Sequence, residues 1–362
     1  MGKVVDRCVT IGYLCLSAVV MATLVAGACE NPPPSCTCHD ADHRLECKQA
    51  DVFPDPVPSG VTKLIIQDST FLKIPAKLNI TSVTFIDISN TVIDDIADTA
   101  FANMDALETL IINKNNIDIL RHTSFTGLKS LKKLELEMGR FTELPPAMFQ
   151  ELPALTQLSL SHNELALTDT TFEYVSPDLE AFSCISCNLS MVPVNIFQEM
   201  ENLDTLHLNK NNFNTIEDKS FTHLSKLKIL GLDSVGLTSL TDFTFQGLPK
   251  LERLRLSNNA LTEIPTRAFH DQGDLKELYL EFNKLESLNK DLLEWKRLRH
   301  LNLTGNPWLC DCNIKWMSDL HYDTAITVRC ANPEELRSYS VHNATTNLQC
   351  DTGTDSSTIV LA

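Results

Sequence analysis

Apolar residues recur along this chain in one fixed pattern, L-x-x-L-x-L-x-x-N-x-L, with aliphatic side chains at positions one, four and six. A clear copy runs from Leu251 to Leu261. Eight successive intervals from Val83 to Leu275 are 24 residues long, so the register persists over most of the chain. This period predicts one repeat architecture, although a length of 362 residues alone would suggest two or three domains. The first positions of the units are Val61, Val83, Leu107, Leu131, Leu155, Leu179, Leu203, Leu227, Leu251, Leu275 and Leu298.

Each unit is predicted to contribute one short strand. Positions four and six alternate as residues do in a strand, so both side chains point to the same face. One unit cannot bury that face by itself, whereas stacked units bury it against their neighbours. The pattern therefore predicts a solenoid whose core is built from contacts between adjacent turns.

Position nine is asparagine in more than half of the units. Its amide has donors and an acceptor, so it can bond backbone groups at the bend where the strand ends. We hypothesise that turns with asparagine hold their weaker neighbours in register. Asparagine is present at Asn115, Asn163, Asn211, Asn259, Asn283 and Asn306, and it is replaced by Thr91, Gly139, Cys187 and Val235.

Phenylalanine follows the same period and predicts an internal aromatic spine. An aromatic stripe could also be a ligand track, but the shared register favours the inside of the coil. Residue 173, where the spine skips a place, is Glu173 with Phe172 beside it, so we expect the turn 155–178 to be irregular. The spine consists of Phe101, Phe125, Phe149, Phe197, Phe221, Phe245 and Phe269.

The pattern over residues 29–350 resembles the leucine-rich repeat family in its long extracellular form. The segment 306–312, NPWLCDC, followed by Trp316, resembles the C-terminal flanking cap of that family. The resemblance implies an α/β-type repeat solenoid, a horseshoe of about eleven repeats with a parallel β-sheet on its concave face. It also implies disulfide-bonded caps at both ends, as in Toll-like ectodomains, Slit-type proteins and variable lymphocyte receptors.

Eight of the twelve cysteines flank the repeats, four at each end. Small caps need disulfides or a metal, because they bury too little surface to be stable alone. Four cysteines allow three pairings, and spacing does not choose among them. An oxidising compartment disfavours metal ligation, and we expect neither a metal nor a cofactor. The family resemblance implies the pairs Cys29–Cys38, Cys36–Cys47, Cys310–Cys330 and Cys312–Cys350.

The first residues are predicted to direct secretion. Lys3 and Arg7 precede an uncharged stretch that ends in Ala26-Gly27-Ala28, a small-residue cleavage site. An uncleaved anchor is the alternative, because the apolar stretch is long enough to span a bilayer. The expected organisation is a signal peptide (1–28), an N-terminal cap (29–60), repeats (61–305), a C-terminal cap (306–350) and a polar tail (351–362).

The tail is too short for a lipid-anchor signal or a membrane span. We therefore expect no membrane span after signal cleavage and a secreted, extracellular product, unless the sequence lacks a C-terminal anchor of its own.

Two further motifs have ordinary interpretations. Cys184 and Cys187 form a C-x-x-C sequence, but they occupy the inward position six and the asparagine position nine. We expect packed core thiols there, with a local disulfide as the alternative. The run from His39 to His43 has metal-binding residue types, yet it lies between cap cysteines and is expected to be a solvated loop.

Charge and motifs exclude other classes of function. Acidic residues outnumber basic ones by 47 to 30, a balance that argues against nucleic-acid binding. The sequence contains no nucleophile elbow, HExxH motif or phosphate-binding loop. We therefore expect a protein that is not an enzyme.

The candidate ligand-binding residues lie at positions three, five, seven and eight, which face outward from the concave sheet. At about 4.8 Å per strand the sheet is roughly 50 Å long, enough for a protein partner. Apolar, aromatic and arginine side chains at these positions point to two patches, because such residues dominate binding at interfaces. The N-terminal patch is Ile65, Phe85 and Ile111, and the C-terminal patch is His207, Arg253, Arg255, Tyr279 and Phe282.

Four glycosylation sequons are present, at Asn79, Asn188, Asn302 and Asn343. Asn302 stands at position five of the last strand, beside the strand of Tyr279. A glycan there would restrict access to the C-terminal patch, so we rank the N-terminal patch first.

The resemblance implies a secreted recognition protein that binds a protein or glycan on its concave face, in innate immunity or at the cell surface or matrix. A non-catalytic companion or inhibitor of a secreted enzyme is the alternative. A collagen-binding proteoglycan is disfavoured by the C-terminal cap. Neither the ligand nor the oligomeric state is predicted.

Overall fold

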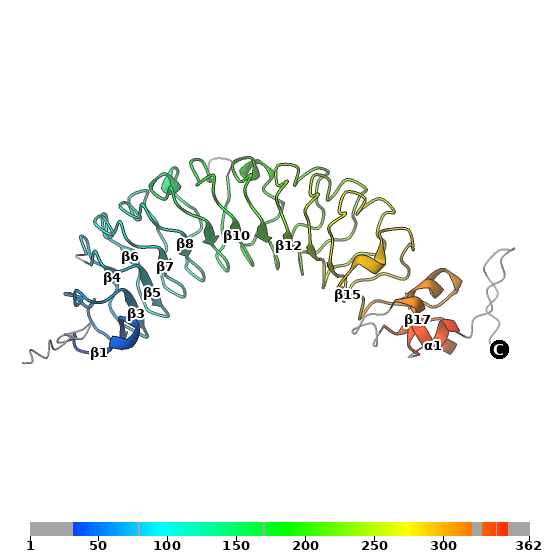
Figure 1. Ribbon diagram of the computed structural model, residues 1–362, viewed down its shortest axis with the longest axis horizontal. Coiled ribbons are helices and arrows are strands. Elements are labelled where there is room, and N and C mark those ends of the chain that lie inside the picture. The colour runs from blue at the N-terminus through cyan, green and yellow to red at the C-terminus, as the bar shows by residue number, and fades with distance from the viewer. Residues whose placement is uncertain (1–31, 79, 169–170, 321–327, 338, 347–362) are drawn as a thin grey trace, which may run out of the picture.

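The computed structural model describes residues 32–78, 80–168, 171–320, 328–337 and 339–346. These residues form an arched solenoid with its strands on the concave side (Figure 1). The predicted solenoid with a parallel sheet on its concave face is thus confirmed. The predicted signal peptide, the polar tail and the residues Cys29, Asn79 and Cys350 lie outside the described residues.

The concave sheet has 13 strands, of which eleven come from the predicted repeats and two from the N-terminal cap. The repeat strands are parallel, and β1 pairs with β2 antiparallel. The cap strands are β1 (Cys36–His39) and β2 (Arg44–Lys48). The repeat strands are β3 (Lys63–Gln67), β5 (Phe85–Ser89), β7 (Thr109–Ile111), β8 (Lys133–Glu135), β9 (Gln157–Ser159), β10 (Ala181–Ser183), β11 (Thr205–His207), β12 (Ile229–Gly231), β13 (Arg253–Arg255), β14 (Glu277–Tyr279) and β15 (His300–Asn302).

The return segments of the repeats contain only short elements. No α-helix occurs among the described residues of the repeats, because each turn crosses back in a few residues of extended or 3-10 structure. These elements are β4 (Lys73–Ile74), β6 (Asp95–Ile96), η2 (Met148–Glu151), η3 (Val194–Glu199) and η4 (Trp295–Arg297). The caps add η1 (Asp40–Asp42), β16 (Trp308–Leu309), η5 (Cys312–Asp319), β17 (Cys330–Asn332), η7 (Glu334–Leu336) and α1 (Val341–Thr346).

Equivalent positions of adjacent repeats are aligned across the sheet. Each strand pairs with the next without a shift, so the residues at position five form one continuous row, here called the position-five row. Its members, in order, are Glu46, Ile65, Asp87, Ile111, Glu135, Ser159, Ser183, His207, Gly231, Arg255, Tyr279 and Asn302.

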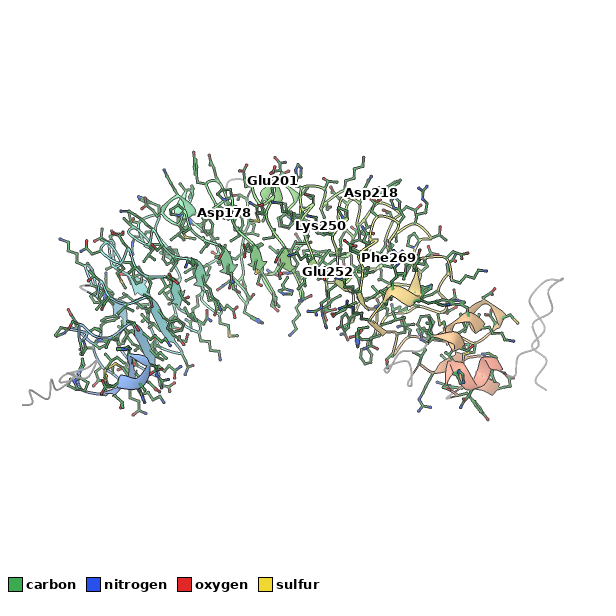
Figure 2. All side chains as sticks on the ribbon, in the orientation of Figure 1. Asp178, Glu201, Asp218, Lys250, Glu252 and Phe269 are labelled. Atoms are coloured by element: carbon green, nitrogen blue, oxygen red, sulfur yellow. A yellow bond between two sulfur atoms is a disulfide. The ribbon has the colours of Figure 1, made fainter. Side chains whose placement is uncertain are left out.

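The core lies between the sheet and the return segments. All seven phenylalanines of the predicted spine are buried, which confirms their place inside the coil. Figure 2 shows Phe269 within the body of the solenoid, whereas Glu201 and Asp218 stand along its outer rim. At the irregular turn Phe172 fills the skipped place, because its ring stacks on Phe149 at 5.3 Å between centroids.

Each asparagine at position nine bonds the turn that precedes it. The Asn211 Oδ1 accepts the N–H groups of Cys187 and Leu189, both at 3.0 Å. Its Nδ2 donates to the carbonyls of Cys184 and Leu208, both at 2.8 Å. A turn that lacks asparagine therefore has its bend satisfied by the asparagine of the next turn, which supports the hypothesis that neighbours stabilise the weaker turns.

The bend itself depends on position eight, whose residue adopts a left-handed backbone conformation throughout the repeats. Left-handed φ values are unusual for residues other than glycine, so the bonds around the bend must offset their cost. The pattern of apolar residues does not predict this feature. The residues concerned are Asp68, Asn90, Lys114, Met138, His162, Ser186, Lys210, Ser234, Asn258, Phe282 and Gly305.

Disulfides join the cap strands. Cys36 is bonded to Cys47 across β1 and β2. Cys310 is bonded to Cys330 at the start of β17. These are two of the four pairs that the resemblance implies. Cys38 and Cys312 are also disulfide-bonded, and their implied partners lie outside the described residues.

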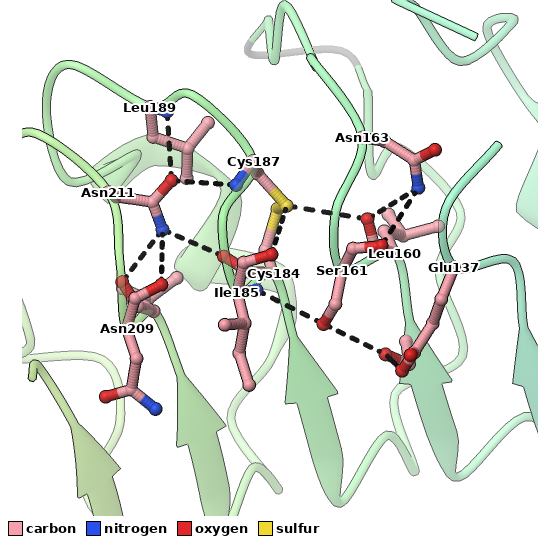
Figure 3. Close-up of a disulfide and its surroundings, with 12 residues drawn as sticks. Glu137, Leu160, Ser161, Asn163, Cys184, Ile185, Cys187, Leu189, Asn209 and Asn211 are labelled. Atoms are coloured by element: carbon pink, nitrogen blue, oxygen red, sulfur yellow. Dashed lines mark hydrogen bonds between the residues drawn. A yellow bond between two sulfur atoms is a disulfide. The ribbon is translucent and has the colours of Figure 1, made fainter. Parts of the chain in front are cut away.

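The expectation of packed thiols at Cys184 and Cys187 is wrong, because the two residues form a disulfide with a Cα–Cα distance of 5.5 Å (Figure 3). Elsewhere position nine approaches position six of the same turn: the Asn163 Nδ2 donates to the Leu160 carbonyl at 2.7 Å. The bend therefore brings these two positions together, and the covalent bond replaces the hydrogen bond. Both sulfurs belong to fully buried residues.

Candidate binding surface on the concave sheet

The N-terminal patch surrounds a residue that the sequence analysis did not select. Ile65 and Ile111 both belong to the position-five row, but Asp87 of β5 lies between them. Phe85 points to the same face of β5, two residues before Asp87, and pairs with Lys63 and Thr109. The three apolar side chains are half-buried, and together they border the Asp87 carboxylate on both neighbouring strands and along its own strand.

Asp87 is half-buried and has no ion-pair partner among the described residues. Its Oδ1 accepts a hydrogen bond from the Ser89 hydroxyl. Burial raises the pKa of the Asp87 carboxyl; the Ser89 hydrogen bond opposes this effect, and the negative charge of Glu135 adds to it. The carboxylate thus lies in a partly apolar setting without a cation to neutralise it.

The other carboxylates of this part of the position-five row are neutralised within the chain. Glu46 accepts from the Lys48 ammonium at 2.7 Å, and this hydrogen bond lowers the pKa of the Glu46 carboxyl. Glu135 contacts the Lys133 ammonium at 2.7 Å and the Asn113 amide at 2.8 Å. Acidic and apolar residues therefore alternate from β2 to β8, and only the central acid lacks a cation.

The C-terminal patch contains arginines that are already paired. The Arg253 guanidinium donates two hydrogen bonds to Glu277, at 2.6 and 2.9 Å. Tyr279 donates its hydroxyl to the same carboxylate at 3.1 Å. The hydrogen bond from Arg253 lowers the pKa of the Glu277 carboxyl, as expected for a bidentate pair.

Arg255 and Tyr279 extend this cluster along the position-five row. The Arg255 Nε donates to Asp233 at 2.5 Å, and the guanidinium carbon lies 4.5 Å from the centre of the Tyr279 ring. Tyr279 in turn lies against His300, with 4.7 Å between ring centroids. Each arginine of the C-terminal patch thus has a carboxylate from this chain, and the patch is neutralised internally.

His207 lies at the inner end of the same patch. Its ring leans over Gly231, where an added Cβ would stand 2.9 Å from the His207 Nδ1. This Nδ1 is buried and has no hydrogen-bond partner among the described residues. Burial lowers the pKa of the imidazole, and the charge of Arg255 lowers it further. The residue is therefore favoured in its neutral form.

Phe282 stands apart from the strands, at position eight beyond β14. Its ring is 56% exposed and covers the backbone of Gly305, where an added Cβ would stand 2.5 Å from the ring. The structure therefore places Phe282 at the rim of the C-terminal patch. Between the two patches the Ser159 hydroxyl donates to Glu137 at 2.5 Å, so this stretch offers small polar groups.

The described sequons differ in position. Asn188 and Asn343 are exposed away from the concave sheet. Asn302 is half-buried on β15, directly opposite Tyr279 of β14, and its Oδ1 accepts the Thr304 N–H at 3.2 Å. A glycan attached to Asn302 would stand beside the Arg255–Tyr279 stack.

Other candidate features lie away from the concave sheet. A hollow of about 590 Å³ is bordered by Leu165, Met191 and Phe213 on the return segments, and it contains no residue of either patch. Within the described residues, no three His, Cys, Asp or Glu side chains are grouped to hold a metal ion. In the same part of the chain, no helix has the length and apolar character needed to cross a membrane.

The leucine rich repeat family matches residues 81–138, 185–234, 225–285 and 254–307, which together cover half of the chain. The chain therefore belongs to the leucine-rich repeat family. Human and mouse Immunoglobulin superfamily member 10 are each 40% identical to it over 53 residues, which is 14% of this chain and 2% of theirs.

Two solved structures share the arched fold. A chain of the mouse RP105/MD-1 complex superposes with a TM-score of 0.77 at 22% identity, covering 85% of this chain and 54% of that chain. A chain of the Drosophila Toll–Spatzle complex gives a TM-score of 0.55 at 18% identity, covering 82% and 56%. This chain thus spans about half the length of both, and at these identities the likeness establishes the fold.

Proposed function

We propose that this protein is a secreted, non-enzymatic recognition module that binds a protein or glycan ligand on its concave sheet. The observation that carries the proposal is the position-five row, which presents aligned side chains on every repeat strand except β12, where Gly231 stands. The spacing of the strands makes this face long enough for an interface of standard size. Innate immunity and the cell surface or matrix are the settings we propose.

The structural neighbours support a protein ligand. Both were solved as complexes, one of RP105 with MD-1 and one of Toll with Spatzle. The disulfides of the caps support an oxidising, extracellular location. Removal of residues 1–28 as a signal peptide is part of the same proposal.

Within the concave sheet we propose the N-terminal patch as the primary contact. Its apolar side chains and the Asp87 carboxylate that they border remain open to a partner, whereas the arginines of the C-terminal patch are paired with Asp233 and Glu277. The sequon at Asn302 supports the same ranking, because a glycan there would crowd the C-terminal patch.

The test is affinity capture from the extracellular fluid of the source, with bound proteins identified by mass spectrometry and their affinities measured. The bait is compared with a triple variant, Ile65→Ala, Phe85→Ala and Ile111→Ala. A matched control changes three exposed apolar residues outside the concave sheet, Leu72, Ile119 and Met191, to alanine.

Loss of binding in the first variant and retention in the control would support the proposal. Full binding by the first variant would refute the N-terminal patch as the contact. Capture of a stoichiometric secreted enzyme would favour the companion or inhibitor role.

A further inference from the structure

We propose that the N-terminal patch recognises a basic side chain, a lysine or arginine of a protein ligand, through the Asp87 carboxylate. This inference rests on the concave-face function proposed above and names the chemistry of the partner at that site. The carboxylate would pair with the cation, and the surrounding apolar side chains would contact the aliphatic stem that carries it.

The geometry suits a long basic side chain. Ile65 and Ile111 lie one strand to either side of Asp87, at a spacing of about 4.8 Å per strand. Phe85 projects from the same face of β5. Lysine and arginine bury their methylene groups along apolar surface while their charged end reaches a polar partner. The apolar side chains of the patch border three sides of the Asp87 carboxylate, so a basic side chain could contact both at once.

Among the described residues, no lysine or arginine forms an ion pair with Asp87, so a cation of the partner can do so. Glu46 is held by Lys48, and Glu135 is held by Lys133, so neither carboxylate needs a cation from outside. Lys63 of β3 stands in the neighbouring position-three row, but it is exposed and makes no ion pair with Asp87. Asp87 is the acid of this segment that is still open to pairing.

Asp233, which lies beside the C-terminal patch, shows how the chain neutralises another half-buried carboxylate. Asp233 has Arg255 on one oxygen and the Ser257 N–H on the other. Asp87 receives one neutral hydroxyl. A half-buried charge without a counter-ion is unfavourable, so a ligand cation would gain from a site that is already partly desolvated.

A metal ion fits the position poorly. Calcium and magnesium take six or more oxygen ligands, most of them supplied by carboxylates, carbonyls or water. The neighbours of Asp87 in the position-five row are isoleucines, which supply none. The observations therefore favour an organic cation on an aliphatic stem.

The experiment pans a phage library of random short peptides against the immobilised full chain, and it measures the affinities of enriched peptides for purified variants. We expect the enriched peptides to share a lysine or arginine beside aliphatic residues. Asp87→Asn should weaken their binding roughly tenfold or more, as measured for close charge pairs at interfaces. Asp118→Asn, which removes an exposed acid outside the concave sheet, should leave the affinity unchanged.

A double-mutant cycle separates recognition from a structural effect. Replacing the basic residue of the peptide by glutamine should weaken binding to the unmodified chain and have little further effect on the Asp87→Asn variant. Additive losses would overturn the inference.

The outcomes distinguish the two proposals. Peptides that lose binding to the triple alanine variant but carry no basic residue would overturn this inference and leave the concave-face function standing. Peptides that bind the triple variant as tightly as the unmodified chain would refute the concave contact itself.

Discussion

Asn211 is the side chain whose amide bonds the Cys184 carbonyl, at 2.8 Å from its Nδ2. Where a turn and the turn after it both have asparagine, the equivalent carbonyl is bonded twice: Leu256 accepts from both Asn259 and Asn283. Because position nine of its turn is Cys187, Cys184 lacks the first of these donors. The contribution of an asparagine to stability therefore depends on the residue that occupies position nine in the adjacent turns.

We predict that Asn211→Ala destabilises the fold more than Asn283→Ala, by at least about 2 kcal/mol in the free energy of unfolding. Asn211→Ala leaves the carbonyls of Cys184 and Leu208 without a side-chain donor. Asn283→Ala leaves Leu256 bonded by Asn259. Chemical denaturation of both variants is the measurement, and equal losses would contradict the role assigned to neighbouring turns.

We predict that the residues usual at these two positions, leucine at position six and asparagine at position nine, can replace the disulfide between Cys184 and Cys187. The double variant Cys184→Leu, Cys187→Asn should fold with a stability close to that of the unmodified chain, because asparagine would restore the hydrogen bond made elsewhere. The variant Cys184→Ala, Cys187→Ala should lose about 2 kcal/mol or more, since it removes buried side chains and adds no donor. Thermal melting compares the two, and a thiol assay under denaturation should detect no free thiol from this pair.

Gly231→Ala should destabilise the concave sheet by about 1 to 3 kcal/mol, because its Cβ would stand 2.8 Å from the Asn209 Oδ1 and 2.9 Å from the His207 Nδ1. Gly273→Ala is the matched control, since nothing lies within 4 Å of the added atom there. The free energies of unfolding of the two variants provide the comparison. Similar free energies for the two variants would contradict the prediction, because they would show that the side chains of His207 and Asn209 move aside at no cost.

Asp87→Asn should stabilise the free protein at neutral pH. The pKa of the Asp87 carboxyl is raised above its ordinary value of 3.8 in the folded state, so the folded protein binds the proton more readily than the unfolded chain. Its contribution therefore becomes more favourable as pH falls through the folded pKa. The stability gain of the variant should be present at pH 7 and should disappear below about pH 3.8. Unfolding measured across this range tests the sign, and a variant less stable at pH 7 would contradict it.

The fold could be predicted because its determinants are local and periodic. A 24-residue interval fixes which side chains point inward, and Phe125 or Leu254 is buried for the same reason as its counterpart in the next turn. Phe172 was anticipated only as an irregularity, since its stacking on Phe149 depends on how the chain runs through that turn.

The candidate site could be predicted only in part. The positions that face outward follow from the period, so Ile65, Arg255 and Tyr279 were placed on the concave sheet in advance. Which charges neutralise one another depends on the register between strands and on the length and conformation of the side chains. Arg253 and Glu277 belong to different repeats, so the pattern within one repeat does not predict their ion pair. Asp87 is not among the predicted contact residues, because apolar and aromatic side chains are the usual mark of an interface, although the 24-residue period places it in the position-five row.

The backward direction of the asparagine bonds gives the solenoid two unequal ends. Each asparagine bonds the turn that precedes it, and no asparagine of the repeats follows the last turn, so a donor to that turn comes from outside the repeats. Trp308, which is fully buried, supplies it: its indole Nε1 donates to the Leu303 carbonyl at 3.1 Å, as the next asparagine would. Repeats could therefore be deleted or inserted ahead of this tryptophan, but any shortened chain must keep it as its terminator.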